Sequence, residues 1–362
     1  MTVSWQRRRW LAATAAFGLT GCGGLMVGVG AAPLRRIAIA SCTDQTRPQP
    51  LWDTVLADRP DLMIFGGDNV YASGQPWSAA ALERAYAQQA AVPQFARLRA
   101  AVPHLAIWDD HDYGLSDGGA EFAHRSESKA AFLRFWQVPA DDPRRGREGI
   151  QHAQVFGPPG QRVQVILLDT RWFRSRWKAT DVRGAPGRER YLPDDDPGKT
   201  MLGDAQWHWL ARQLREPAEL RLLVSGVQVL ADGHGWERWG NFPRERQRLY
   251  RLIADTRAGG VVFLSGDRHF GALYRETGGT PYPLYELTSS GVTHTWRGAS
   301  EAGPNRLGEP YDDLHYGIVD IDWRERALQL AVKDPAGRVQ RAVRVPLAAL
   351  QGTPDGDPRS NS

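Results

Sequence analysis

One short stretch, HLAIWDDHDYG at residues 104–114, sets three aspartates and a histidine side by side: Asp109, Asp110, His111 and Asp112. The first residues of the stretch are typical of a strand that enters a core. The carboxylates would then meet at the end of a buried strand, where they repel one another and lose solvation. Two interpretations follow: either the run is a solvated turn, or a cation binds there and supplies the missing positive charge.

Similar side chains close the other apolar stretches of the chain. Six predicted strands end in the polar residues Ser41 and Cys42; Asp68, Asn69 and Tyr71; Asp109 to Asp112; Asp169, Thr170 and Arg171; Gln228; and Asp267 and His269. Ligands of open α/β sheets bind beyond the carboxyl ends of the strands, so we expect one shared rim. A single aspartate there would be a cap or a turn former. Four carboxylates, two imidazoles and a thiol together are hard to hold without cations.

This set of residues predicts hydrolytic metal chemistry. Carboxylates, imidazoles and a bridging aspartate can hold two cations about 3.5–4 Å apart, and such a pair activates water and clamps the oxygens of a phosphoryl group. The sequence contains no G-x-x-x-x-G-K-[ST] nucleotide loop and no G-x-S-x-G serine elbow. LTSSGVTH, residues 287–294, offers serines in a different frame, so a serine hydrolase is the weaker alternative.

The elements that must position these residues alternate along the chain. Strands are predicted at 36–42, 61–68, 104–110, 162–171, 220–228 and 259–269. Helices are predicted between them at 51–60, 78–101 with a break at Pro93, 127–136, 203–216 with Asp204 as its cap, and 243–258. This alternation predicts an α/β domain whose sheets are covered by helices. The strand-rich segment 284–347 predicts a second, more antiparallel sheet.

The N-terminus is predicted to be a targeting segment rather than part of the fold. QRRRWLAA and the short apolar run 10–19 resemble a twin-arginine export signal over residues 1–21, and LTGC resembles a lipoprotein cleavage box that would lipidate Cys22. A plain secretory peptide cleaved near Ala31 or Ala32 is the alternative. Residues 22–34 would be a tether, and 351–362 a disordered tail. Three of the 45 basic residues lie in the signal, so the remaining 42 nearly balance 41 acidic ones and indicate no nucleic-acid-binding surface.

Several motifs in fixed order carry a family resemblance: SC, GDNVY, WDDHDYG, LDTR, MLGDAQWHWL, SGVQ, FPRERQRL, FLSGDRH and ELTSSGVTH. From about Ile37 to at least His294 the chain resembles the PhoD-like alkaline phosphatase/phosphodiesterase family of calcineurin-like metallophosphoesterases. The resemblance implies a four-layer α/β/β/α sandwich, two mixed sheets flanked by helices, over residues 35–350. We expect no room for the extra N-terminal β domain that some members carry.

The resemblance also implies a ligand set for a ferric ion. Cys42 and Tyr71 would bind Fe³⁺, with Tyr71 three residues after Asp68 as in the similar G-D-x-x-Y motif of purple acid phosphatases. Asp68 would bridge to a second cation. His269 would complete the iron side, with Asp267 as the alternative.

The second cation would be Ca²⁺ or another divalent ion held by Asp68, Asp110 and Asp267. Asp109 is an alternative or additional ligand, and Gln228 is a further candidate. In the wider superfamily the Asp110 position is Asn, and the Gln228 and Asp267 positions are usually His. These departures favour oxygen ligands and therefore a harder cation than Zn²⁺.

Three further residues are catalytic candidates by the same resemblance. His111 would act as general acid or charge stabiliser toward the phosphate or the leaving group. Arg171 would clamp phosphate oxygens, or else cap a surface turn. Asn69 would bind phosphate, or else shape its turn.

We therefore expect an exported enzyme, periplasmic or membrane-anchored and monomeric, that hydrolyses small-molecule phosphate esters through a metal-activated hydroxide. The alternatives are a phospholipase-D-like phosphodiesterase and a non-catalytic lipoprotein that binds metal or phosphate.

Overall fold

The computed structural model describes residues 32–299, 301 and 303–352. The predicted signal, the predicted lipidation site Cys22 and most of the predicted tether and tail lie outside the described residues. Within the described part of the chain, no helix is both long and apolar enough to cross a membrane.

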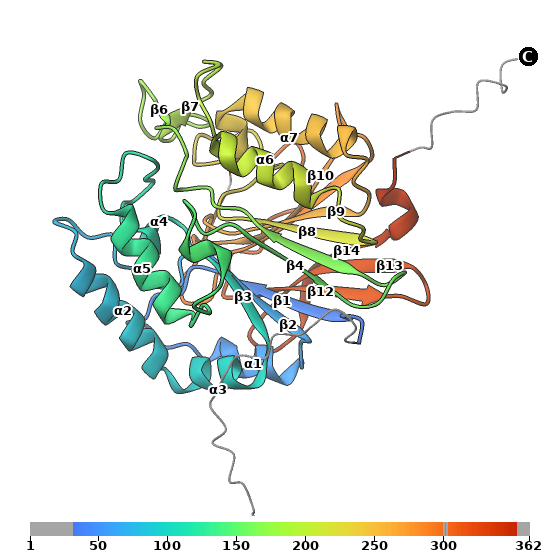
Figure 1. Cartoon of the computed structure of the whole chain (residues 1–362), viewed down its shortest axis with the longest axis horizontal. Coiled ribbons are helices and arrows are strands. Elements are labelled where there is room, and N and C mark those ends of the chain that lie inside the picture. The colour runs from blue at the N-terminus through green and yellow to red at the C-terminus, as the bar shows by residue number, and fades with distance from the viewer. Residues whose placement is uncertain (1–31, 300, 302, 353–362) are drawn as a thin grey trace, which may run out of the picture.

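The first sheet has six strands in the order β14-β13-β12-β1-β2-β3. Its parallel half consists of β1 (Arg36–Ala40), β2 (Leu62–Gly66) and β3 (His104–Ile107). Its antiparallel half is the C-terminal meander of β12 (Tyr316–Asp322), β13 (Ala327–Lys333) and β14 (Val339–Pro346). Figure 1 shows β12 lying along β1, so the ends of the chain meet in one sheet.

The expectation that the C-terminal strands form a second sheet was therefore wrong for β12, β13 and β14. Strand β12 pairs antiparallel with β1, and the side chains of Arg36 and Asp320 form an ion pair across that junction with Nε and Oδ1 2.6 Å apart. The pairing covers the edge that β1 would otherwise expose, and exposed strand edges are a liability for a folded protein.

The second sheet has the order β10-β11-β9-β8-β5-β4 and is also mixed. Its strands are β4 (His152–Phe156), β5 (Val163–Leu167), β8 (Leu220–Ser225), β9 (Val261–Ser265), β10 (Gly271–Glu276) and β11 (Leu284–Ser289). The four inner strands are parallel and almost wholly buried; β5, β8 and β9 are largely apolar, as is typical of strands buried on both faces, whereas β11 carries Glu286, Thr288 and Ser289. The edge strands β4 and β10 were not predicted, and neither was the short hairpin of β6 (Lys178–Ala179) and β7 (Tyr191–Leu192).

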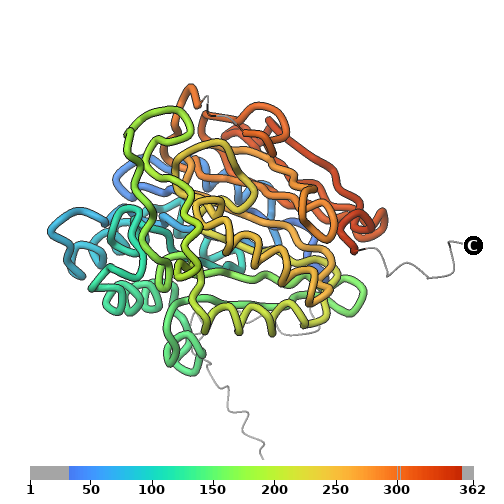
Figure 2. The backbone as a smooth tube through the Cα atoms, turned by 90° about the horizontal axis from the view of Figure 1, so that it is seen from above, coloured from blue at the N-terminus to red at the C-terminus, as the bar shows by residue number. Residues whose placement is uncertain are grey.

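Helices cover the outer faces of both sheets, which confirms the predicted sandwich. The first sheet is covered by α1 (Leu51–Ala57), α2 (Ala79–Ala91), α3 (Pro93–Ala101) and α5 (Arg125–Phe135). The second sheet is covered by α6 (Gly203–Gln213) and α7 (Pro243–Asp255), which lie nearest the viewer in Figure 2.

Two details of the helices could be compared with the sequence. The predicted break is present, because Val92 is extended and Pro93 starts α3 at a position where its missing N–H costs nothing. The predicted cap Asp204 was wrong: Leu202 is the cap residue and Asp204 lies in the first turn of α6. The Thr200 hydroxyl accepts a hydrogen bond from the Gly203 amide instead, at 2.8 Å.

Candidate metal centre

The candidate residues lie where the carboxyl ends of strands from both sheets meet. Cys42 follows β1, Asp68 follows β2, and Asp267 and His269 follow β9. All four have a left-handed backbone, with φ of 61°, 49°, 70° and 55°. Residues other than glycine adopt this conformation rarely and at a cost, and such strain concentrates at functional sites. The predicted single rim is thus two rims, one from each sheet, that face each other.

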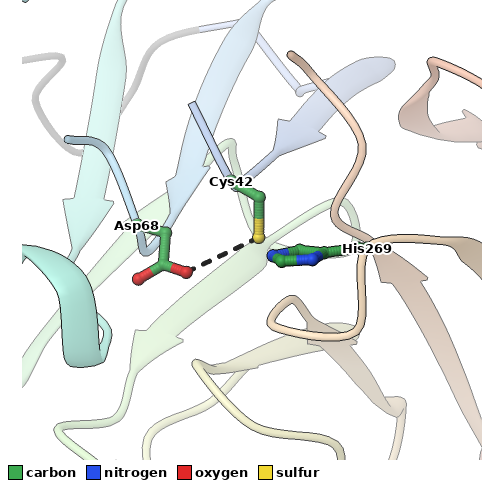
Figure 3. A group of neighbouring side chains, drawn as sticks. All are labelled: Cys42, Asp68 and His269. Atoms are coloured by element: carbon green, nitrogen blue, oxygen red, sulfur yellow. Dashed lines mark hydrogen bonds between the residues drawn. The ribbon is translucent and has the colours of Figure 1, made fainter. Parts of the chain in front are cut away.

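The first group of ligating atoms surrounds one carboxylate oxygen (Figure 3). Oδ2 of Asp68 lies 3.6 Å from Sγ of Cys42 and 3.4 Å from the hydroxyl of Tyr71. The same hydroxyl lies 3.2 Å from Nε2 of His269. A sulfur, a phenol oxygen, a carboxylate oxygen and an imidazole nitrogen therefore converge, as the resemblance predicted for the iron side.

A second group contains only carboxylates and shares the same neighbourhood. One oxygen each of Asp109, Asp110 and Asp267 lie within 4.8 Å of one another, and Asp68, Asp110 and His111 form a further such group. Asp68 thus belongs to both sides, which is the geometry required of a bridging ligand. Asp267 lies with the carboxylates, which favours the second cation over the iron side for this residue.

Two buried oxygens of this group have no protein partner. They are Oδ2 of Asp109 and Oδ1 of Asp110, both in side chains that are nearly inaccessible to solvent. Buried polar atoms are almost always hydrogen-bonded, and an unpaired buried charge is costly. The solvated-turn interpretation of residues 109–112 is therefore excluded, and the donor set fits a cation.

The pKa shifts of the candidate ligands also favour a bound cation. Burial raises the pKa of Asp68 and Asp267 well above the ordinary value, and repulsion by neighbouring carboxylates adds to the effect. Burial also raises the pKa of the Cys42 thiol, again reinforced by Asp68 and Asp267. A bound cation would reverse these shifts and keep the ligands deprotonated.

Glycines let the two rims approach closely. A Cβ on Gly67 would lie 2.6 Å from Cβ of Asp109, and Gly67 has a φ of 105°. A Cβ on Gly226 would lie 2.1 Å from Oδ1 of Asp109. The glycines of GGDNVY and SGVQ therefore make room for the Asp109 side chain from opposite sheets.

His111 lies at the solvent side of the centre, with 26% of its side chain exposed. Its Nδ1 lies 2.7 Å from the Ser73 hydroxyl, and its ring packs on Tyr71 with centroids 4.1 Å apart. Its backbone amide donates to Oδ1 of Asp68 at 3.1 Å. The Ser73 contact leaves Nε2 for a ligand, which agrees with the predicted role of His111.

A model of the PhoD-like phosphatase family matches residues 37–329 of the chain. The chain belongs to the PhoD-like phosphatases. Alkaline phosphatase D of Bacillus subtilis (strain 168) is 23% identical over 189 residues, which are 47% of this chain and 31% of the relative. The match thus spans about a third of that relative's length. A solved structure of PhoD superimposes with a TM-score of 0.67 at 16% identity, covering 92% of this chain and 74% of that one, and confirms the fold.

In this PhoD-like phosphatase Arg171 does not cap a surface turn, so that alternative was wrong, and the phosphate clamp stays a prediction. The side chain is fully buried. Its Nε donates to Oδ1 of Asp109 at 2.7 Å, and its two terminal nitrogens donate to the carboxylate of Glu237 at 2.7 and 2.8 Å. These contacts use most of its N–H groups and favour a role for Arg171 in fixing Asp109 in position over the phosphate clamp.

Asn69 is structural in the PhoD-like centre, which corrects its assignment as a catalytic residue. Its amide nitrogen donates to the carbonyl of Ile107 at 2.7 Å and to Oδ2 of Asp112 at 2.5 Å. Both amide hydrogens are used, and the alternative that Asn69 shapes its turn is the one the contacts favour.

Gln228 is engaged in a separate hydrogen-bond network. Its Nε2 donates to Tyr274 and Thr288, both at 2.9 Å, and its Oε1 lies 3.2 Å from Nε2 of His234. These contacts use both amide hydrogens and one side of the oxygen, so we do not include Gln228 in the proposed ligand set.

Two carboxylates beside the centre were missed from the sequence. Oxygens of Asp117 and Glu237 lie within 4.8 Å of Asp110, and the Asp117 amide donates to Oδ2 of Asp110 at 2.7 Å. Both lie in long connections without a periodic pattern, so no sequence signal pointed to them.

Proposed function

We propose that this chain hydrolyses phosphate esters with water activated at a two-cation centre. The observation that carries the proposal is the position of Asp68 between two sets of ligating atoms, one with a thiol, a phenol and an imidazole and one with carboxylates only. Membership of the PhoD-like phosphatases supports the same activity.

We propose Fe³⁺ for the first set, namely Cys42, Asp68, Tyr71 and His269, and Ca²⁺ or another divalent cation for the second, namely Asp68, Asp110 and Asp267. The first set offers sulfur and phenol donors, whereas the second offers only the carboxylate oxygens that hard cations prefer. When bound, such a pair supplies positive charge to the phosphate and makes water acidic enough to react at neutral pH.

The chain's own residues would do the remaining work. Nε2 of His111 lies 4.0 Å from Oδ2 of Asp110, at the edge of the ligand group, and would donate a hydrogen bond or a proton to the departing oxygen. Ser73 holds the ring of His111, and Arg171 holds Asp109 against the ligand group.

Two alternative functions differ from this proposal, one in its substrate and the other in having no catalytic activity. A phospholipase-D-like phosphodiesterase would use the same centre, and a non-catalytic binding protein would need no acid at residue 111. The test is turnover of p-nitrophenyl phosphate and of its bis-p-nitrophenyl diester by metal-loaded protein. Hydrolysis of either supports the proposal, the ratio separates monoester from diester preference, and a loaded protein inert to both contradicts catalysis.

We also propose that the chain is exported, anchored in the membrane through lipidated Cys22, and monomeric. The support is the sequence of residues 1–22 alone. Mass spectrometry of the mature N-terminus tests the anchor, because an unmodified terminus near residue 32 would contradict it. A dimer in equilibrium sedimentation would contradict the monomer.

A further inference from the structure

An exposed tryptophan is joined by its backbone to a candidate metal ligand. Among the described residues, three large hydrophobic side chains are exposed: Val182, Trp296 and Val339. Trp296 is 42% exposed, and its backbone amide donates to the carbonyl of His269 at 2.8 Å. An apolar surface left in water forgoes stabilisation by burial, and exposed apolar surface beside a site often serves binding.

Trp296 is held in a fixed arrangement with a second indole. The rings of Trp236 and Trp296 meet edge to face, with centroids 4.7 Å apart. The guanidinium of Arg268 lies 5.1 Å from the Trp236 ring and 5.6 Å from the Trp296 ring. Arg268 is almost fully buried and forms an ion pair with Glu301. The cation stabilises both rings, so the pair is ordered before any ligand binds.

The pair is connected to both halves of the metal centre. On one side Arg268 stands between the candidate ligands Asp267 and His269 in the sequence, and Trp296 bonds to His269. On the other side Trp236 precedes Glu237, whose carboxylate lies within 4.8 Å of Asp110. The chain segments that carry both indoles therefore adjoin residues of the metal centre.

We propose that Trp296 binds the organic group of the phosphate ester, and that this group carries a flat aromatic ring, either an aryl group or a nucleobase. Trp236, whose ring lies 5.2 Å from the Arg190 guanidinium and 5.1 Å from that of Arg268, would hold Trp296 in position. The inference rests on the proposed function. Indoles gain stacking or edge-to-face contacts with a ring beyond the burial of area, whereas a small aliphatic alcohol gains little from them.

Phenylphosphonate and methylphosphonate separate this proposal from differences in leaving-group reactivity. Neither has an ester bond to break, so each is measured as a competitive inhibitor of p-nitrophenyl phosphate hydrolysis by the metal-loaded enzyme. Trp296→Ala should weaken inhibition by phenylphosphonate about tenfold, within the range found when an aromatic stacking partner is removed. Inhibition by methylphosphonate should change less than about twofold, since its methyl group cannot stack.

Two further variants make the result specific. Trp323→Ala is the matched control, because Trp323 directly follows β12 and its indole donates to the Leu34 carbonyl at 2.8 Å; it should leave both inhibition constants unchanged. Trp296→Leu keeps apolar area without a π face and should still lose most of the preference for phenylphosphonate.

The outcomes distinguish the two proposals. Equal effects of Trp296→Ala on both phosphonates, or full retention of the preference in Trp296→Leu, would overturn the aromatic subsite while leaving the hydrolase intact. A wild-type protein that neither hydrolyses phosphate esters nor binds either phosphonate would overturn the proposed function itself.

Discussion

Replacing Arg171 by methionine should destabilise the protein strongly without directly changing its affinity for phosphate. The side chain is fully buried between Asp109 and Glu237, and its removal leaves two buried carboxylates without their cation. Breaking a buried ion pair costs about 3–5 kcal/mol, a large part of the roughly 5–15 kcal/mol that a domain has. The measurement is the free energy of unfolding in urea, at fixed metal concentration.

The same substitution at an exposed ion pair provides the control. Arg97 bonds to Asp53 at 2.7 Å with both side chains about half exposed, so Arg97→Met should cost no more than about 1 kcal/mol. Pairing Arg171→Met with Glu237→Gln should recover part of the loss, because the double variant leaves fewer unpaired charges. An Arg171→Met protein of normal stability with a raised KM would instead support the phosphate clamp and refute our interpretation.

Three more predictions follow from single side chains. His111→Ala should lower kcat by about 10²- to 10⁴-fold and retain iron, because the proposed iron ligands do not include the His111 ring; loss of iron would contradict this. Burial lowers the pKa of His315 to about 4, and the neutral ring accepts a hydrogen bond from the Ser290 amide at Nε2. The contribution of neutral His315 to the free energy of unfolding is present above about pH 6.5 and falls by about 3 kcal/mol as the pH drops toward 4. The free energy of unfolding in urea should therefore decline less for His315→Gln than for the wild type between these pH values, and an equal decline would refute the assignment. Asn69→Ala should lower the free energy of unfolding by about 1–3 kcal/mol through the unpaired groups that it leaves, and an unchanged stability would contradict the structural role.

The gathering of the candidate residues could be predicted because each follows an apolar stretch. Cys42, Asp68, Asp110 and His269 come within four residues of a strand's end, and local sequence determines where a strand stops. Their assignment to particular cations rested on the family resemblance. The pairing of the strands could not be predicted in the same way. The contact between Arg36 and Asp320 joins residues 284 positions apart, and only the folded chain brings them together.

The aspartates of residues 104–114 show that residue type alone does not predict the role of a side chain. Asp112 accepts the Asp109 amide at 2.7 Å and the Asn69 side chain, so it closes the turn. One carboxylate oxygen of Asp109 accepts a hydrogen bond from Arg171, and one of Asp110 accepts from the Asp117 amide. Three identical side chains within four residues therefore differ in function because their partners differ, and partners such as Arg171 come from distant segments that the sequence pattern does not specify.

The measurement that tests the account most directly is the metal content of the wild-type protein and of Cys42→Ala, taken by mass spectrometry together with a visible absorption spectrum. We predict iron roughly equimolar with the chain, calcium or another divalent cation beside it, and a tyrosinate–iron band, with iron and activity both lost in Cys42→Ala. Full activity in metal-free protein, or unchanged iron and activity in Cys42→Ala, would contradict the proposed centre.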